Sequence, residues 1–133
     1  MRGLFVIVAM GWALAASALA QTPPETSTAC KLDQVAAYDT RVHVRCKEYD
    51  IYRDGSGAEH RQQSWRNAFD PNVIYFAVDA HSPLADRVVA LASAAGANDD
   101  VTIFFRTNAA ENPPGCLPAD CRKLTGLVLP IPH

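Results

Sequence analysis

The chain has 133 residues, with 12 basic and 14 acidic side chains and a formal net charge of −2. This near-balance of charge argues against nucleic acid or an anionic membrane surface as the partner. The length fits one domain.

The first 20 residues have the three zones of a secretory signal peptide. Arg2 supplies the positive end, an apolar stretch follows from Leu4, and residues 18–20 (Ala-Leu-Ala) form a small-residue cleavage motif before Gln21. The alternative is a membrane anchor, but Gly11 interrupts the apolar stretch, which is short for a span of about 20 residues. We therefore predict export, cleavage after Ala20 and a periplasmic or secreted product, with no membrane insertion.

Four cysteines follow the signal peptide: Cys30, Cys46, Cys116 and Cys121. An even number of cysteines in a small exported domain predicts two disulfides, for which three pairings are possible. We favour Cys116–Cys121, which closes a short loop, together with Cys30–Cys46. A four-cysteine zinc site would need two close pairs, and only one is present, so no metal is predicted.

Residues 21–30 are polar and are expected to form a flexible arm before a single domain at 31–133. From Leu32 the pattern becomes strand-like, and a turn at Asp39-Thr40 predicts a hairpin whose second strand is 41–46. Strict alternation in this strand places Val42, Val44 and Cys46 toward the core and Arg41, His43 and Arg45 toward solvent.

The segment 47–70 is charged and has no sustained periodicity. It is predicted to be a long loop, with a short strand near 49–52 and a helical turn near 62–69. Long loops in compact domains are usually functional or mobile.

The near-continuous apolar run at 73–78 predicts a buried strand. A helix should follow, with Ser82 as N-cap, Pro83 in the first position and Gly96 at its end. The positions 84, 88, 91 and 95 form its apolar face: Leu84, Val88, Leu91 and Ala95.

Two more strands are predicted at 101–106 and 124–129, separated by a loop that contains Pro113-Pro114-Gly115. Five strands with one helix between the third and fourth are typical of an OB-fold barrel, in which Leu84, Val88 and Leu91 would plug one end. The alternative is an α+β sheet with one helix packed on a face.

No catalytic motif is present: the chain lacks a G-x-S-x-G elbow, a phosphate-binding glycine loop before a helix, and H-E-x-x-H. His43 between two arginines could bind an anion, but we favour the simpler explanation, a solvated polar face of a half-buried strand. No cofactor and no enzymatic activity are predicted; a small hydrolase is the third choice.

Binding residues are predicted in the middle loop, where aromatic faces lie among hydrogen-bonding side chains, as a sugar or an extended peptide requires. The candidates are Tyr49, Tyr52, Arg53, Ser64, Trp65 and Arg66. The alternative is that Trp65 and Phe69 fasten the loop to the core.

From Ile74 onward the chain resembles the B subunits of secreted bacterial toxins, of the pertussis-like and subtilase-cytotoxin-like type. The resemblance rests on the strand 74–78, the helix after Ser82-Pro83, the strand 101–105 and the close pair Cys116–Cys121. It implies an OB-fold, glycan binding and a pentameric ring. The chain departs from the family at Ala77, where such subunits often have a cysteine, and in its longer tail.

The sequence therefore predicts an exported, disulfide-linked module that binds a carbohydrate. The alternative is a periplasmic protein-interaction or inhibitor domain without a sugar site.

Overall fold

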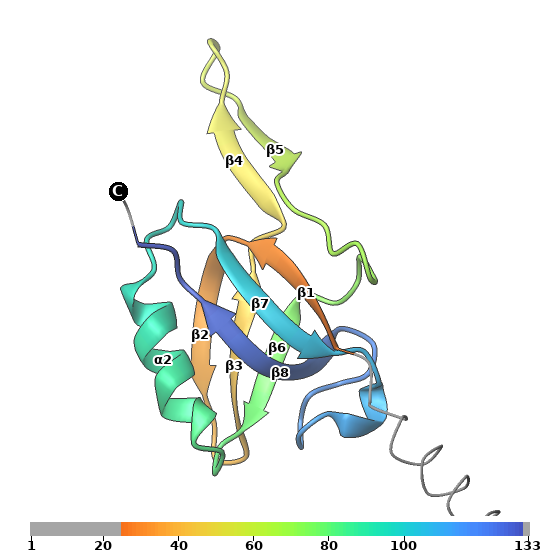
Figure 1. Ribbon diagram of the computed structural model, residues 1–133. Helices are drawn as coiled ribbons and strands as arrows, with labels where there is room; N and C mark the ends of the chain where they lie inside the picture. Colours follow the sequence, from red (N-terminus) through yellow and green to blue (C-terminus); the bar gives the residue numbers. More distant parts are fainter. Residues whose placement is uncertain (1–24, 132–133) are drawn as a thin grey trace, which may run out of the picture.

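A computed structural model describes residues 25–131, which form a mainly β domain with one α-helix (Figure 1). This confirms the fold class at that level. In chain order, the elements are β1 (Glu25–Cys30), β2 (Leu32–Ala37), β3 (Arg41–Cys46), β4 (Tyr49–Arg53), β5 (Glu59–Gln63), β6 (Tyr75–Asp79), α2 (Leu84–Ala94), β7 (Val101–Arg106), the 3-10 turn η1 (Ala109–Glu111) and β8 (Cys121–Val128).

Six of the strands form one sheet in the order β1-β7-β8-β6-β3-β2, and β4 and β5 form a separate pair. Neighbours in the large sheet are antiparallel except β6 and β8, which are parallel. The two edge strands, β1 and β2, are consecutive in the chain with only Lys31 between them. The sheet therefore curls, so that its two edge strands are joined by the chain at Lys31. Within the described residues, β1 and β2 do not pair with each other by hydrogen bonds.

The predicted flexible arm is wrong for residues 25–30, which form edge strand β1. This strand pairs with β7 from Glu25 opposite Arg106 to Cys30 opposite Val101. Cys30 is buried and disulfide-bonded to Cys46, which fixes the end of the strand on the core. The predicted signal peptide, its cleavage site and residues 21–24 lie outside the described residues.

The core lies inside the curled sheet. Val42, Val44 and Cys46 of β3 face it as predicted, and the rings of Phe76 and Phe105 meet there with centroids 4.9 Å apart. Burying each large apolar side chain contributes about 1.5–3 kcal/mol relative to leaving it exposed.

Helix α2 contacts strands β2, β3, β6 and β8. Its buried residues are Ala85 and Val88, whereas Leu91 is 37% exposed. The predicted apolar face is therefore wrong at Leu91, because the helix turns Ala85 and Val88, which are three residues apart, toward the sheet.

The ends of α2 also differ from the prediction. Pro83 occupies the N-cap in place of Ser82, whose hydroxyl oxygen still accepts the Leu84 N–H at 3.2 Å. The helix ends at Ala94, and the N–H of Gly96 donates to the Asp99 carboxylate at 2.7 Å.

The structure differs from two further local predictions, one strand boundary and one helical turn. The last strand begins at Cys121 instead of residue 124, because the disulfide carries the chain directly into the sheet beside β6. The helical turn expected near residues 62–69 is absent from that segment, which begins with the end of β5 and continues as irregular chain.

Both predicted disulfides are confirmed: Cys30–Cys46 and Cys116–Cys121, with Cα separations of 5.7 and 5.2 Å. Two disulfides indicate an oxidising environment of the kind found outside the cytoplasm. Among residues 25–131, none of the helices has the length and apolar character needed to cross a membrane.

Candidate ligand-binding site

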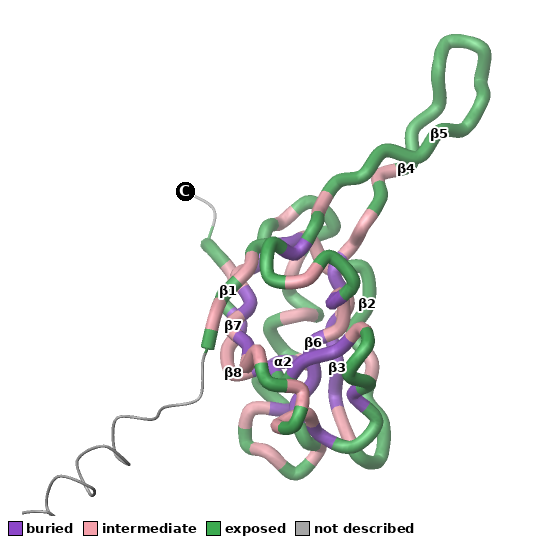
Figure 2. The backbone as a smooth tube through the Cα atoms, turned by 90° about the vertical axis from the view of Figure 1, so that its right-hand side faces the viewer, coloured by how far each residue is buried: buried purple, intermediate pink, exposed green. Residues whose placement is uncertain are grey.

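Three of the predicted binding residues lie on a hairpin that projects from the body. Strands β4 and β5 pair only with each other, and Figures 1 and 2 show them extending away from the large sheet. Tyr49 and Tyr52 are 45% and 49% exposed, and Arg53 is exposed beside them. We refer to β4 and β5 with their turn as the hairpin.

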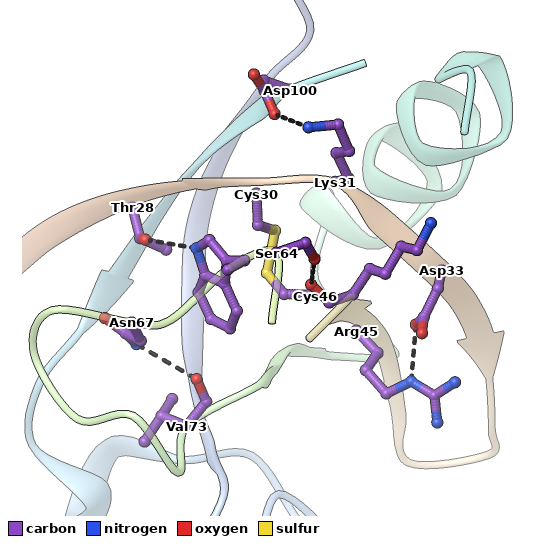
Figure 3. Close-up of a disulfide and its surroundings, with 12 residues drawn as sticks. Thr28, Cys30, Lys31, Asp33, Arg45, Cys46, Ser64, Asn67, Val73 and Asp100 are labelled. Carbon is purple, nitrogen blue, oxygen red and sulfur yellow. Dashed lines mark hydrogen bonds and ion pairs between the residues drawn. A yellow bond between two sulfur atoms is a disulfide. The ribbon is translucent and has the colours of Figure 1, made fainter. Parts of the chain in front are cut away.

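The other three predicted residues lie at the base of the hairpin. Ser64 donates its hydroxyl to the carbonyl of Lys47 at 3.2 Å, and Arg66 is exposed. Trp65 is half-buried against the core, and its indole N–H donates to the hydroxyl of Thr28 at 3.3 Å. Trp65 therefore fastens the chain to β1 at Thr28, and Figure 3 shows Thr28 near the Cys30–Cys46 disulfide.

The hairpin turn is ordered by Asp54. Its carboxylate accepts hydrogen bonds from the hydroxyl of Ser56 at 2.5 Å and from Nε2 of His60 at 2.6 Å. The bonds from Ser56, followed by that from His60, lower the pKa of Asp54 to about 2. The ring of His60 also stacks on Tyr52 at 5.2 Å, so these groups serve the turn itself.

A cavity of about 310 Å³ lies on the outer face of the sheet, between the β2–β3 turn and the loop 113–121. We call residues 113–121 the disulfide loop, because the Cys116–Cys121 bond closes it. The side chains that line the cavity combine aromatic faces with hydrogen-bonding groups. They are Gln34, Tyr38, Arg41, His43, Tyr75, Leu117 and Asp120, with Gly115 and Cys121.

His43 forms the floor of this cavity. The prediction that it faces solvent is wrong, since it is only 6% exposed. It does lie on the outer face of the sheet, as strand alternation requires, but the cavity that contains it is walled by residues of the disulfide loop and by Tyr38 and Tyr75. The centroids of these two rings lie 5.4 and 5.0 Å from that of the imidazole.

The surroundings of His43 favour its neutral form. Burial, followed by the charges of Arg41 and Arg45, lowers its pKa, against an opposing effect of Asp120. Nε2 lies 2.8 Å from Oε1 of Gln34, which as a carbonyl oxygen accepts the proton that Nε2 carries. His43 is thereby held in one orientation as part of a fixed polar surface.

Arg41 is held between the β2–β3 turn and the disulfide loop. Its guanidinium lies 4.3 Å from the centroid of the Tyr38 ring, and its Nη1 occupies the space that a Cβ on Gly115 would need. Gly115 has φ +84°, a conformation that glycine adopts without strain. None of the ion pairs formed within residues 25–131 includes Arg41, so its N–H groups can donate to a ligand.

A second concavity, of about 400 Å³, separates the hairpin from the large sheet. We call it the groove. Asp33, Arg45 and Ile74 line it from the sheet, and Tyr49, Ile51 and Arg61 line it from the hairpin. Within it, the guanidinium of Arg45 donates to the Asp33 carboxylate at 2.7 Å. This bond, followed by one with Tyr75, raises the pKa of Arg45 above its usual range.

The structure thus places the predicted residues on the hairpin and at its base, whereas the cavity above His43 is lined by other residues, most of which the sequence did not single out for binding. Tyr38 and Asp120 flank strands as ordinary turn residues, and only the fold brings them within one cavity. The anion-binding idea for His43 and its arginines was the one signal that pointed toward this face.

Comparison with known proteins gave no match: no protein-family model, no curated protein and no solved structure is similar to the chain.

Proposed function

We propose that this chain is an exported OB-fold-like module that binds a carbohydrate in the cavity above His43. The connectivity supports the OB-fold assignment: if β1 and β2 are taken as one bent strand, the sheet has five strands, with α2 between the third and fourth. OB-folds bind oligosaccharides and oligonucleotides on the face of strands 2 and 3, between the loops after strands 1 and 4.

The position of the cavity carries the proposal. In this five-strand count, strands 2 and 3 are β3 and β6, which contribute His43 and Tyr75. The loops after strands 1 and 4 are the β2–β3 turn with Tyr38 and the segment that ends in the disulfide loop. The proposal is supported by this position, because OB-folds bind their ligands at the corresponding place.

The chemistry of the cavity suits a sugar. The ring face of Tyr38, which is 49% exposed, offers an apolar platform for the C–H groups of a pyranose. Arg41 supplies several donors and Asp120 supplies acceptors, which matches a ligand that carries many hydroxyl groups.

A glycan array tests this proposal. The mature protein should bind a defined group of neutral or charged glycans, and Tyr38→Ala should weaken that binding about tenfold, because the ring is a contact surface and not a core residue. Tyr52→Ala on the hairpin is the matched control and should bind as the unaltered protein does. Binding lost with Tyr52→Ala and kept with Tyr38→Ala would move the site to the hairpin.

Location and assembly remain parts of the proposal. Export to the periplasm or beyond is supported by the two disulfides, and N-terminal sequencing of the mature product should begin at Gln21. The resemblance to toxin B subunits adds a homopentameric ring, for which the native mass of the product is the measurement. A monomeric mass would remove the ring and leave the sugar site unaffected.

The second candidate function is a protein-interaction or inhibitor domain. Ile51 at 58% and Tyr49 at 45% exposure favour it, because a projecting hairpin with apolar side chains is a common contact element. Absence of any glycan binding, together with capture of a periplasmic protein that Ile51→Asp abolishes, would establish this candidate in place of the first.

A further inference from the structure

We propose that the ligand is an extended, neutral oligosaccharide of several units, which runs from the cavity into the groove, with the hairpin as the wall of its distal subsites. This inference rests on the proposed sugar-binding function and deepens it.

The cavity and the groove adjoin along one row of residues. Arg45 on β3 pairs with Gln34 of β2 on one side and Tyr75 of β6 on the other. Gln34 and Tyr75 line the cavity, whereas Arg45 and the neighbours Asp33 and Ile74 line the groove. A chain that leaves the cavity past Tyr75 therefore enters the groove directly.

Aromatic and arginine side chains recur along this path. Tyr38 and Arg41 lie at the cavity end, Tyr75 and Arg45 at the boundary, and Tyr49 and Arg61 at the hairpin. Tyr49 and Arg61 lie on one face of the hairpin, because Tyr49, Ile51 and Arg53 alternate along β4 and Ile51 is the cross-strand partner of Arg61. Repeated platforms with adjacent donors suit a polymer of similar sugar units, since each unit needs one apolar face and several hydrogen bonds.

The charge of the path favours a neutral ligand. The three arginines are accompanied by three carboxylates: Asp33 and Glu48 in the groove and Asp120 in the cavity. A groove for a polyanion would carry a clear excess of positive charge. Balanced donors and acceptors match hydroxyl groups, which both donate and accept.

The hairpin has no evident role in the stability of the fold. Residues 51–64 are all exposed, and β4 and β5 are outside the large sheet (Figure 2). A two-stranded hairpin in water is marginally stable at best. A role as the wall of a ligand groove accounts for an ordered turn at Asp54 and for apolar side chains that face the body.

The test is an array in which neutral and negatively charged glycans are each printed as a ladder from one to six units. We expect apparent affinity to rise about tenfold or more from one unit to four. Tyr49→Ala should remove this gain and leave monosaccharide binding unchanged, whereas Tyr38→Ala should weaken every member of the ladder. Tyr52→Ala, on the opposite face of the hairpin, is the matched control and should change nothing.

The outcomes separate the two proposals. Affinity that does not depend on chain length, or a length gain that survives Tyr49→Ala, overturns the extended site and leaves the sugar-binding function standing. Binding confined to negatively charged glycans overturns the neutral class. Binding of no glycan at all overturns both proposals.

Discussion

The two long connections of this domain, the disulfide loop and the hairpin, have opposite relationships to the body. The Cys116–Cys121 bond closes the disulfide loop, and the nearly buried guanidinium of Arg122 donates to the carbonyls of Pro118 at 2.6 Å and Cys121 at 2.7 Å. Asn112 donates to the carbonyls of Cys116 and Cys121. The hairpin beyond residue 50 is held only by its own ladder and turn contacts.

This difference indicates what each connection can contribute to a site. A loop with a covalent closure and buried hydrogen bonds presents its groups in fixed positions, so its cavity is formed before a ligand arrives. A hairpin with free edges must spend part of any binding energy on becoming ordered. We therefore assign the primary contact to the cavity and the distal contacts to the hairpin.

The largest expected effect comes from removing the Cys30–Cys46 disulfide. Replacing both cysteines with alanine should lower the free energy of unfolding by about 3 kcal/mol, since the bond closes a loop of 16 residues, and each sulfur is buried. Urea unfolding measures this change. The Cys116–Cys121 bond closes a loop of only 5 residues, so the Cys116→Ala/Cys121→Ala variant should lose about 2 kcal/mol.

The two disulfide variants also test whether the disulfide loop forms the cavity. The variant without Cys116–Cys121 should lose glycan binding at a temperature where it remains folded, whereas the variant without Cys30–Cys46 should retain it. Equal binding by both folded variants would mean that the disulfide loop is not a wall of the site.

Two glycines with the same backbone geometry allow the disulfide loop and the hairpin to be compared. Gly115 in the disulfide loop and Gly57 in the hairpin both have φ +84°, so Gly→Ala strains each by about 1 kcal/mol. A Cβ at Gly57 meets open space, but at Gly115 it would collide with the guanidinium of Arg41. Gly115→Ala should therefore displace the Arg41 guanidinium and weaken ligand binding, while its cost in thermal or urea unfolding should exceed that of Gly57→Ala only slightly, because the colliding atoms end a flexible side chain. Unchanged ligand binding by Gly115→Ala would contradict the packing of Arg41 against Gly115.

The pH dependence of stability should report on His43. Because its pKa in the folded protein is lowered, the unfolded chain binds more protons below the usual histidine pKa. Stability should therefore be constant with respect to this group at neutral pH and should fall as the pH drops below about 6.5. His43→Gln should flatten this part of the profile, measured as urea midpoints between pH 8 and pH 5.

His81→Gln is the control for this profile, since His81 is exposed in the turn before α2. The opposite result would be a pH profile that keeps its slope in His43→Gln and loses it in His81→Gln. That result would refute the role given to His43.

The sequence could predict the local elements and the cysteine pairing, but not the surfaces that depend on tertiary contacts. Period-2 alternation correctly oriented Val42, Val44 and Cys46, because that signal lies within one strand. The same alternation placed His43 on the outer face but could not show that the disulfide loop covers that face.

The remaining errors have the same origin. β1 reads as a polar arm in sequence because its stability comes from pairing with β7 and from the Cys30–Cys46 bond, which involve residues far along the chain. Likewise, the sequence left two roles open for Trp65, a ligand contact or an anchor for the loop, and only its hydrogen bond to Thr28 decides in favour of the anchor. The cavity was missed because its residues come from three segments far apart in the sequence, 34–43, Tyr75 and 115–121.

The smallest effect is expected from removing the hairpin. Ser64 N–H donates to the carbonyl of Glu48 at 2.8 Å, so the chain can be closed across this point by replacing residues 49–63 with a short Gly-Asn-Gly linker. The unfolding free energy should change by less than about 1 kcal/mol, because the deleted side chains are almost all exposed and the loop is shortened. Urea unfolding and circular dichroism measure this.

The same truncated protein resolves the roles of the two connections. If the hairpin only extends the binding surface, the truncated domain keeps its disulfides, its cavity and its monosaccharide affinity, and loses the added affinity for longer chains. A large loss of stability would instead make the hairpin part of the folding unit. In that case its exposed tyrosines would need packing contacts that residues 25–131 do not show. The assignment of the cavity as the primary site and the hairpin as an accessory wall would then be wrong.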